Sequence, residues 1–470
     1  MSFAQPTRRQ MLQQVSCGFG GLALAGLCQG KASPLSPRLG PGQAKAKRVI
    51  FIFMQGGPSQ VDSFDYKPEL EKSHGKDYDF VGVRFGTFGQ ASKRKLMKPL
   101  WDFHQRGQTG RWVSDLFPEI GKHVDDLCFL HGMHTEGVAH GPSTLFLHTG
   151  ATNLVRPSMG SWISYGLGTE NQNVPGFITI NPADSKGGPR NYSNAFLPAV
   201  HQGTAIGSAG QSAKNARFRN IVNQHWEHDV QQRQFALLQS LNRAQQAQRP
   251  SAVANDPTEA MIESYELAWR MQMNAPGLTD LSSEDPNTLA NYGIGEKATD
   301  DFGRQCLLAR RMAEEGVRFI QVNYSDESPT PRWDQHSNMP KHLEHARATD
   351  KPVAGLLADL KARGLLEDTL VWWGGEFGRT PFSQNNDGRD HNPRGFTVWL
   401  AGGGVKAGLA YGSTDELGDT AVDGRIHMHD LHATILHQLG LDHEQLTYRY
   451  AGRDFRLTDV HGKVVHEILA

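Results

Sequence analysis

Residues Val371 to His391 begin with V-W-W-G-G-E-F-G-R-T-P and end with R-D-H. Residues Thr369 to Trp373 are β-branched, apolar or aromatic without a break, which indicates a strand buried on both faces of a sheet. Gly374-Gly375 ends that strand. The polar residues that follow should therefore lie in loops beyond its carboxyl end, where open α/β sheets bind ligands. These residues are Glu376, Arg379, Asp390 and His391.

The overall composition limits the class of protein. The 470 residues hold 48 Lys and Arg against 49 Asp and Glu, a net charge of -1 that argues against nucleic-acid binding through bulk charge. The chain is long enough for one large core with insertions or for two domains. Its 21 histidines are unusual and, with carboxylates, suit a transition-metal site. Outside an N-terminal apolar segment the only cysteines are Cys128 and Cys306, which excludes a cysteine metal cluster and a disulfide framework.

The N-terminus is typical of an export signal. Arg8-Arg9 is a twin arginine, and Cys17 to Cys28 is an apolar, glycine-rich run too short to span a membrane in the mature protein. We therefore predict a twin-arginine signal over residues 1–33 and a linker over residues 34–47, with export by the twin-arginine translocase to the periplasm or the cell exterior. The alternative is a chance Arg-Arg pair before an apolar patch.

A second candidate for a buried strand is Arg48 to Met54, followed by the glycine turn Q-G-G-P-S. Asp62 and Asp65 come soon after this turn. Either residue could cap a helix or close an Asx-turn. Their place after a strand favours Asp62 as a metal ligand, and Asp65 to a lesser degree.

A third candidate strand, Val124 to His131, leads towards the sequence H-G-P-S-T-L-F-L-H-T-G, which starts at His140. Pro142 fits the first turn of a helix. His140 and Ser143 would then lie at a helix N-terminus, where the helix dipole and the free N–H groups favour an anion.

The second half of the chain alternates between helices and strands. Phe302 to Glu315 predicts a helix and Val317 to Tyr324 a strand, which the sequence W-D-Q-H follows at residues 333–336. Pro352 to Ala362 predicts another helix before the strand quoted first. This order indicates right-handed βαβ units in a mostly parallel sheet. At about residues 205–295 the alternation stops, and we predict an inserted helical cap with a solvated, charged face.

Several motifs together resemble the family called domain of unknown function 1501. They are Q-G-G-P-S-Q-V-D-S-F-D, R-P-S-M-G-S-W, W-D-Q-H, G-E-F-G-R-T-P and G-R-D-H. That family is similar to the alkaline phosphatase and sulfatase superfamily. The resemblance implies a three-layer α/β/α sandwich with a mostly parallel central sheet over residues 48–470, and one or two metal ions at the carboxyl edge of the sheet.

The same resemblance implies ligands for those ions. Asp334 and His336 are similar to an Asp and His pair of one metal site, and His391 is similar to a late histidine ligand. Glu376 takes the place of one member of the other metal pair. The Asp that customarily follows the first strand is absent, which leaves Asp62 or Gln55 to replace it. The predicted metal ligands are Asp62, Asp334, His336, Glu376 and His391.

The catalytic group differs from that of the superfamily. His140 stands where sulfatases carry the cysteine that becomes formylglycine, so the customary nucleophile is absent. A covalent route would use His140 or Ser143 as nucleophile. Attack by water activated at a metal would instead give His140 a metal or acid–base role and leave Ser143 dispensable. The second route is favoured, because histidine binds metals well and forms only a labile adduct.

The chemistry of these residues points to hydrolysis. An Asp, a Glu and two or three His bind a divalent ion such as zinc or manganese, with calcium a further candidate, and the ion can polarise a phosphoryl or sulfuryl oxygen. Arg379 would add bidentate recognition of the anion. We expect an exported metal-dependent hydrolase of phosphate or sulfate esters, acting on small molecules or polysaccharides. The alternatives are a non-catalytic binding or assembly protein with a structural metal, and a different metalloenzyme.

Overall fold

The strand β1 (Arg48–Met54) lies inside a nine-stranded sheet with the order β14-β6-β13-β10-β1-β9-β7-β8, in which β17 also pairs with β6. The structure, a computed structural model, describes residues 33–79, 93–218, 225–247 and 257–470. The predicted signal with Arg8-Arg9 lies outside the described residues. The other strands of the sheet are β6 (Leu127–His134), β7 (Phe177–Ile180), β8 (Thr204–Ile206), β9 (Phe319–Tyr324), β10 (Thr369–Gly374), β13 (Phe396–Ala401), β14 (Ala410–Tyr411) and β17 (Ile426–His427).

The direction of the strands decides which loops meet. β1 pairs in parallel with β9 and β10, β7 with β8 and β9, and β14 and β17 with β6. β13 is antiparallel to both of its neighbours, β10 and β6, and is the one strand of the described sheet that runs the other way. The predicted mostly parallel sheet is confirmed. The start of β13 therefore lies at the edge where the parallel strands end.

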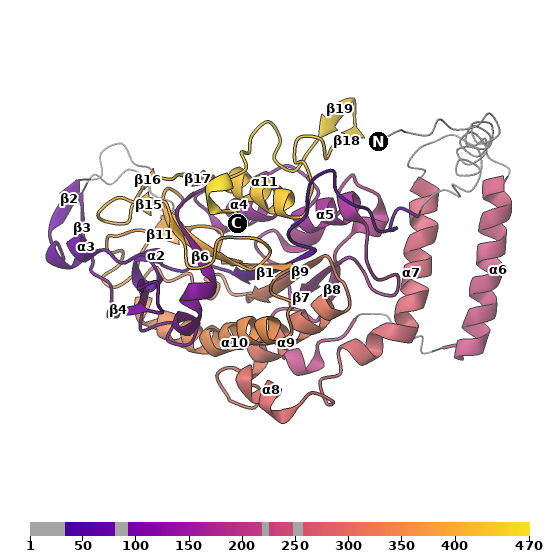
Figure 1. The fold of residues 1–470 in the computed structure, drawn as a ribbon, viewed down its shortest axis with the longest axis horizontal. Helices are drawn as coiled ribbons and strands as arrows, with labels where there is room; N and C mark the ends of the chain where they lie inside the picture. Colours follow the sequence, from indigo (N-terminus) through magenta and orange to yellow (C-terminus); the bar gives the residue numbers. More distant parts are fainter. Residues whose placement is uncertain (1–32, 80–92, 219–224, 248–256) are drawn as a thin grey trace, which may run out of the picture.

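Helices cover both faces of the sheet (Figure 1). Ile50 and Ile52 of β1 belong to the core shared with α9 and α10, whereas Phe51 and Phe53 belong to the core shared with α4, α5 and α11. Burial on both faces explains why the strand sequences are continuously apolar. The predicted three-layer α/β/α sandwich is confirmed. The helices are α4 (His140–Thr149), α5 (Met159–Leu167) and α11 (Met428–Gln438) on one face, and α9 (Asp300–Glu314) and α10 (His342–Ala362) on the other.

Two elements start well away from the predicted residue, and β9 and α9 each start two residues from it. The third strand begins at Leu127, because residues Ile120–Asp126 form a 3-10 helix whose start is capped by the carboxylate of Asp350. α10 begins ten residues before Pro352, which lies inside the helix. A proline was expected to open a helix, but tertiary packing on the sheet outweighs its local cost here.

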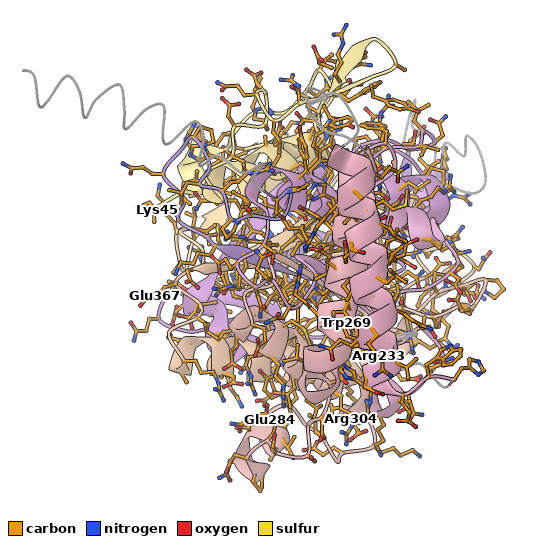
Figure 2. All side chains as sticks on the ribbon, turned by 90° about the vertical axis from the view of Figure 1, so that its right-hand side faces the viewer. Lys45, Arg233, Trp269, Glu284, Arg304 and Glu367 are labelled. Carbon is orange, nitrogen blue, oxygen red and sulfur yellow. The ribbon has the colours of Figure 1, made fainter. Side chains whose placement is uncertain are left out.

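Two long helices, α6 (His228–Ala247) and α7 (Pro257–Leu278), stand beside the core (Figure 1). Trp269 of α7, which Figure 2 labels, stacks against Phe235 of α6 with ring centroids 5.2 Å apart. This helical region starts later than the predicted residue 205, because β8 still pairs with β7 in the central sheet. No helix in the described ranges combines the length and the apolar character that a membrane span requires.

Short elements complete the described chain. The helices are α2 (Gln60–Ser63), α3 (Pro68–Lys72) and α8 (Pro286–Asn291). The strand pairs are β2 (Asp77–Asp79) with β3 (Lys93–Lys95), β4 (Phe103–Arg106) with β5 (Arg111–Ser114), β11 (Gly378–Arg379) with β12 (His391–Asn392), β15 (Ser413–Thr414) with β16 (Ala421–Asp423), and β18 (Tyr448–Tyr450) with β19 (Arg453–Phe455).

A buried histidine makes the stability of the fold depend on pH. His148 of α4 packs over Phe51 and Phe53, its Nδ1 lies 2.7 Å from the carbonyl oxygen of Thr144, and its Nε2 lies 2.9 Å from Nε2 of Gln321. Nδ1 therefore donates and Nε2 accepts, so the ring is neutral. Burial lowers the pKa of His148 to about 4, although the Thr144 carbonyl opposes the shift.

The exchange His148→Gln should make the protein less sensitive to acid. The folded pKa of His148 lies below its unfolded value, so between the two values the unfolded state binds more protons and stability falls as the pH falls. From pH 7.5 to pH 5 the wild type should lose about 2 kcal/mol more than the variant. Urea unfolding of both proteins at the two pH values measures this difference, and an equal loss in both would contradict it.

Candidate metal centre

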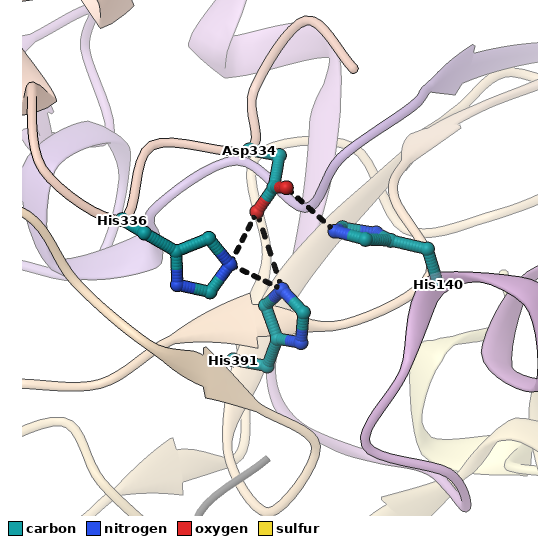
Figure 3. Close-up of side chains that lie close together, drawn as sticks. All are labelled: His140, Asp334, His336 and His391. Carbon is teal, nitrogen blue, oxygen red and sulfur yellow. Dashed lines mark hydrogen bonds and ion pairs between the residues drawn. The ribbon is translucent and has the colours of Figure 1, made fainter. Parts of the chain in front are cut away.

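Four side chains converge at the carboxyl edge of the sheet: His140, Asp334, His336 and His391 (Figure 3). One nitrogen or oxygen atom from each lies within 4.8 Å of those of the others. Nε2 of His336 and Nε2 of His391 lie 2.8 Å and 3.2 Å from Oδ1 of Asp334, and Nε2 of His140 lies 3.1 Å from Oδ2. The Nε2 atoms of His336 and His391 are 3.0 Å apart.

The sheet topology explains this convergence. Asp334 and His336 follow the end of β9, and His140 begins α4 after β6. His391 belongs to β12, which directly precedes the antiparallel strand β13. Because β13 starts where β6 and β9 end, all four residues arrive at the same edge.

Each of the three histidines is oriented by an oxygen atom at its Nδ1. A carbonyl or carboxylate oxygen can only accept a hydrogen bond, so each neutral ring carries its hydrogen on Nδ1 and turns the lone pair of Nε2 towards the centre. Nε2 of His140 is buried and has no hydrogen-bond partner among the described residues. The three contacts are His140 to Oε1 of Glu376 at 2.6 Å, His336 to Oε1 of Gln384 at 2.5 Å, and His391 to the carbonyl oxygen of Val138 at 2.7 Å.

This donor set fits a borderline transition metal. Three imidazole nitrogens and one carboxylate suit zinc, manganese or a similar ion. Calcium, one of the three ions expected from the sequence, takes six to eight oxygen ligands and does not fit this set. His140, Asp334, His336 and His391 would hold the ion.

The charges around the centre favour the ligand forms of Asp334 and His391. Burial alone would raise the pKa of Asp334, but the charge of Arg379 and the three adjacent histidines hold it well below its usual range. Burial lowers the pKa of His391 to about 4, although the adjacent carboxylate of Asp334 opposes the shift. Burial also opposes a charge on His140, yet the adjacent carboxylates of Asp334 and Glu376 raise its pKa overall. A proton and a metal ion therefore compete for His140.

Arg379 supports Asp334 instead of facing a ligand. Its side chain is fully buried, and Nη2 lies 2.7 Å from Oδ1 of Asp334. The guanidinium also donates to the carbonyl oxygens of Gly56, Gly57 and Arg389. These contacts place the predicted anion-binding arginine inside the protein, as the counter-ion of a carboxylate.

Three other predicted site residues lie outside the group of four. Asp62 is fully buried in an ion pair with Arg389, with Nε to Oδ2 at 2.7 Å. Glu376 accepts hydrogen bonds from the backbone of Gly56 and contacts the outer nitrogen of His140. Ser143 is fully buried and its Oγ has no hydrogen-bond partner among the described residues. The structure does not bring Asp62 to the metal position, because a buried arginine neutralises it elsewhere.

Sequence reasoning missed Arg389, Gln384 and the role of Gly56. Arg389 directly precedes Asp390-His391 in the quoted motif, so its position was available, but its partner was not. Gln384 lies in a polar loop with no distinguishing pattern. Gly56 has φ +105°, and a Cβ there would lie 2.3 Å from the carbonyl oxygen of Pro331, so glycine lets the turn after β1 touch the loop that carries Asp334.

No curated protein matches the chain. Similar solved structures include the lipoteichoic acid synthase LtaP from Listeria monocytogenes, at 9% identity and a TM-score of 0.38 over 90% of this chain and 78% of that one. The PsFucS1 sulfatase from Pseudoalteromonas sp. is 12% identical, with a TM-score of 0.33 over 93% and 72% of the two chains. A protein in the alkaline phosphatase superfamily from Vibrio parahaemolyticus is 10% identical, with a TM-score of 0.35 over 88% and 71%.

The family can be stated directly from the sequence match. Residues 46–469 match the family described as protein of unknown function (DUF1501), which is most of the chain. The matched residues include the predicted strands at residues 48–54 and 369–373 and all four residues of the centre. The chain therefore belongs to the DUF1501 family, as its motifs predicted.

Proposed function

We propose that the protein is a metal-dependent hydrolase of phosphate or sulfate esters. The observation that supports this most is the convergence of three imidazole Nε2 atoms on the carboxylate of Asp334, each ring oriented from behind by an oxygen atom. A divalent ion bound there would polarise an ester oxygen and lower the pKa of nearby water. The residues supply a rigid cradle, because Arg379 fixes the charge and the position of Asp334.

The surroundings of the centre favour water as the attacking group. Solvent reaches the group of four at His336, whose side chain is 20% exposed, whereas the other three are 9% exposed or less. Ser143 is fully buried, and a Cβ on Gly137 would lie 2.7 Å from its Oγ. A hydroxyl held so closely has no open path to a substrate, so a covalent step at Ser143 is disfavoured.

A panel of esters tests the proposal. Purified protein loaded with zinc or manganese would be assayed with p-nitrophenyl phosphate, bis-p-nitrophenyl phosphate and p-nitrophenyl sulfate. We expect turnover of at least one ester that chelation abolishes and that His391→Ala lowers by more than tenfold, while Ser143→Ala keeps most of it. Turnover of the same size in the His391→Ala variant would mean that a contaminant or another site is responsible.

A non-catalytic role is the second candidate, and one observation favours it. Four protein groups converge on the centre, and structural zinc sites have four protein ligands, whereas catalytic sites have three and keep a position open. In that case the ion would only tie together the loops after β6 and β9 and the start of β13. Tight metal binding by a protein that turns over no ester in the panel would support this alternative.

The proposal includes export through the twin-arginine pathway, which rests on Arg8-Arg9 and the apolar run after it. Replacing both arginines by lysine should leave the precursor in the cytoplasm. Cell fractionation with an antibody or a C-terminal tag measures this. Export of the lysine variant at the wild-type level would count against a twin-arginine signal.

A further inference from the structure

We propose that Glu376 is a positioning residue for His140 and not a metal ligand, and that the centre holds a single ion. This inference rests on the metal binding in the proposed function. It changes the assignment of Glu376 that its place in the sequence suggested, and it settles between the one and two ions that the superfamily resemblance allows.

The contacts of Glu376 leave it no part in the group of four. Its side chain is fully buried, and the backbone N–H of Gly56 donates to Oε1 at 3.0 Å and to Oε2 at 3.2 Å. Oε1 lies 2.6 Å from Nδ1 of His140, whereas the opposite ring nitrogen, Nε2, faces Asp334. The carboxylate therefore sits behind the histidine, on the side away from the other ligand atoms.

Because Glu376 contacts the outer nitrogen of His140, it should affect the tautomer and the basicity of that ring. Partners at the outer nitrogen of a ligating histidine fix its tautomer and raise its basicity. The hydrogen-bond partner of His336 is a neutral amide, with the carboxylate of Asp390 farther from Nδ1 at 3.8 Å, and that of His391 is a backbone carbonyl. Of the three rings, His140 is the one with a carboxylate oxygen within hydrogen-bond distance of Nδ1. Its Nε2 should be the most electron-rich nitrogen in the set.

The two carboxylates that were predicted as ligands but lie outside the group of four are committed elsewhere. Asp62 is neutralised by Arg389, and Glu376 is held by Gly56 and His140. In the described part of the chain, one group of three or more possible ligands lies close enough to hold an ion. A second ion would have to break a buried ion pair before it could bind, which costs several kcal/mol.

The variant Glu376→Gln tests the inference, because glutamine keeps the shape and an accepting oxygen but removes the charge. Zinc affinity would be measured by competition with a chromophoric chelator, and the number of ions by elemental analysis. Wild type should bind one zinc per chain. Glu376→Gln should still bind one, with affinity lowered about 10- to 100-fold. Glu376→Asp should recover part of the loss, and the exposed Glu344→Gln should change nothing.

Cobalt substitution separates positioning from ligation. If Glu376 is not a ligand, the cobalt absorption spectrum of Glu376→Gln should keep the intensity of the wild type, because intensity reports coordination number. If the wild type binds two ions per chain and Glu376→Gln binds one, the inference is wrong. A zinc affinity of Glu376→Gln equal to that of the wild type would also overturn it. If the wild type binds no zinc or manganese at all, the proposed function falls as well, so the two failures can be told apart.

Discussion

Replacing His336 or His391 by alanine is expected to strip the protein of most of its metal and of the stability that the metal provides. Each residue contributes one of the four converging donor atoms. A ligand that binds only the folded state stabilises it by mass action, so a 100-fold loss of affinity removes up to about 2.7 kcal/mol at saturating metal. Elemental analysis and thermal unfolding with and without added zinc measure both effects.

A matched control is His104→Ala, which removes a half-exposed surface histidine paired with Asp115. This variant should keep the metal content and the zinc-dependent rise in melting temperature of the wild type. If both ligand variants also keep them, the centre in Figure 3 is not a metal site. A chelator should lower the melting temperature of the wild type but leave that of His391→Ala nearly unchanged.

Much of the fold could be predicted because its strands are buried on both faces. The apolar runs at residues 48–54 and 369–373 match strands of the central sheet closely. Helix ends were less predictable, since the sequence around Pro352 favours a helix start that packing overrides. The direction of β13 could not be read from local sequence, and that direction is what brings His391 to the centre.

The sequence predicted the location of the candidate site better than it predicted which carboxylates belong to it. Asp334, His336 and His391 were found by one rule: each is similar to a metal ligand of the superfamily and lies in a loop after or before a strand of the sheet. The same rule also selected Asp62 and Glu376, whose partners come from distant loops or from a backbone N–H group. Position along the chain reports where a carboxylate arrives, but not which cation or hydrogen-bond donor neutralises it.

Removing Asp62 should destabilise the protein strongly while leaving its metal content intact. Both members of the Asp62–Arg389 pair are fully buried, and Asp62 also accepts hydrogen bonds from Ser59 and from the backbone of Leu100. Breaking a buried pair leaves an uncompensated charge and costs about 3–5 kcal/mol. Urea unfolding of Asp62→Ala measures the loss, and elemental analysis of the folded variant measures the zinc.

The partner variant and the double variant show whether the loss comes from the ion pair. Arg389→Met should be destabilised by a similar amount, because Asp62 would then be the unpaired buried charge. Asp62→Ala combined with Arg389→Met should be more stable than the sum of the two single losses predicts, since no charge is left unpaired. Recovery will be incomplete, because Arg389 also donates to the carbonyl oxygens of Met97 and Thr380. If instead Asp62→Ala keeps its stability and loses zinc, Asp62 is a metal ligand. Its assignment as the structural ion-pair partner of Arg389 would then be wrong.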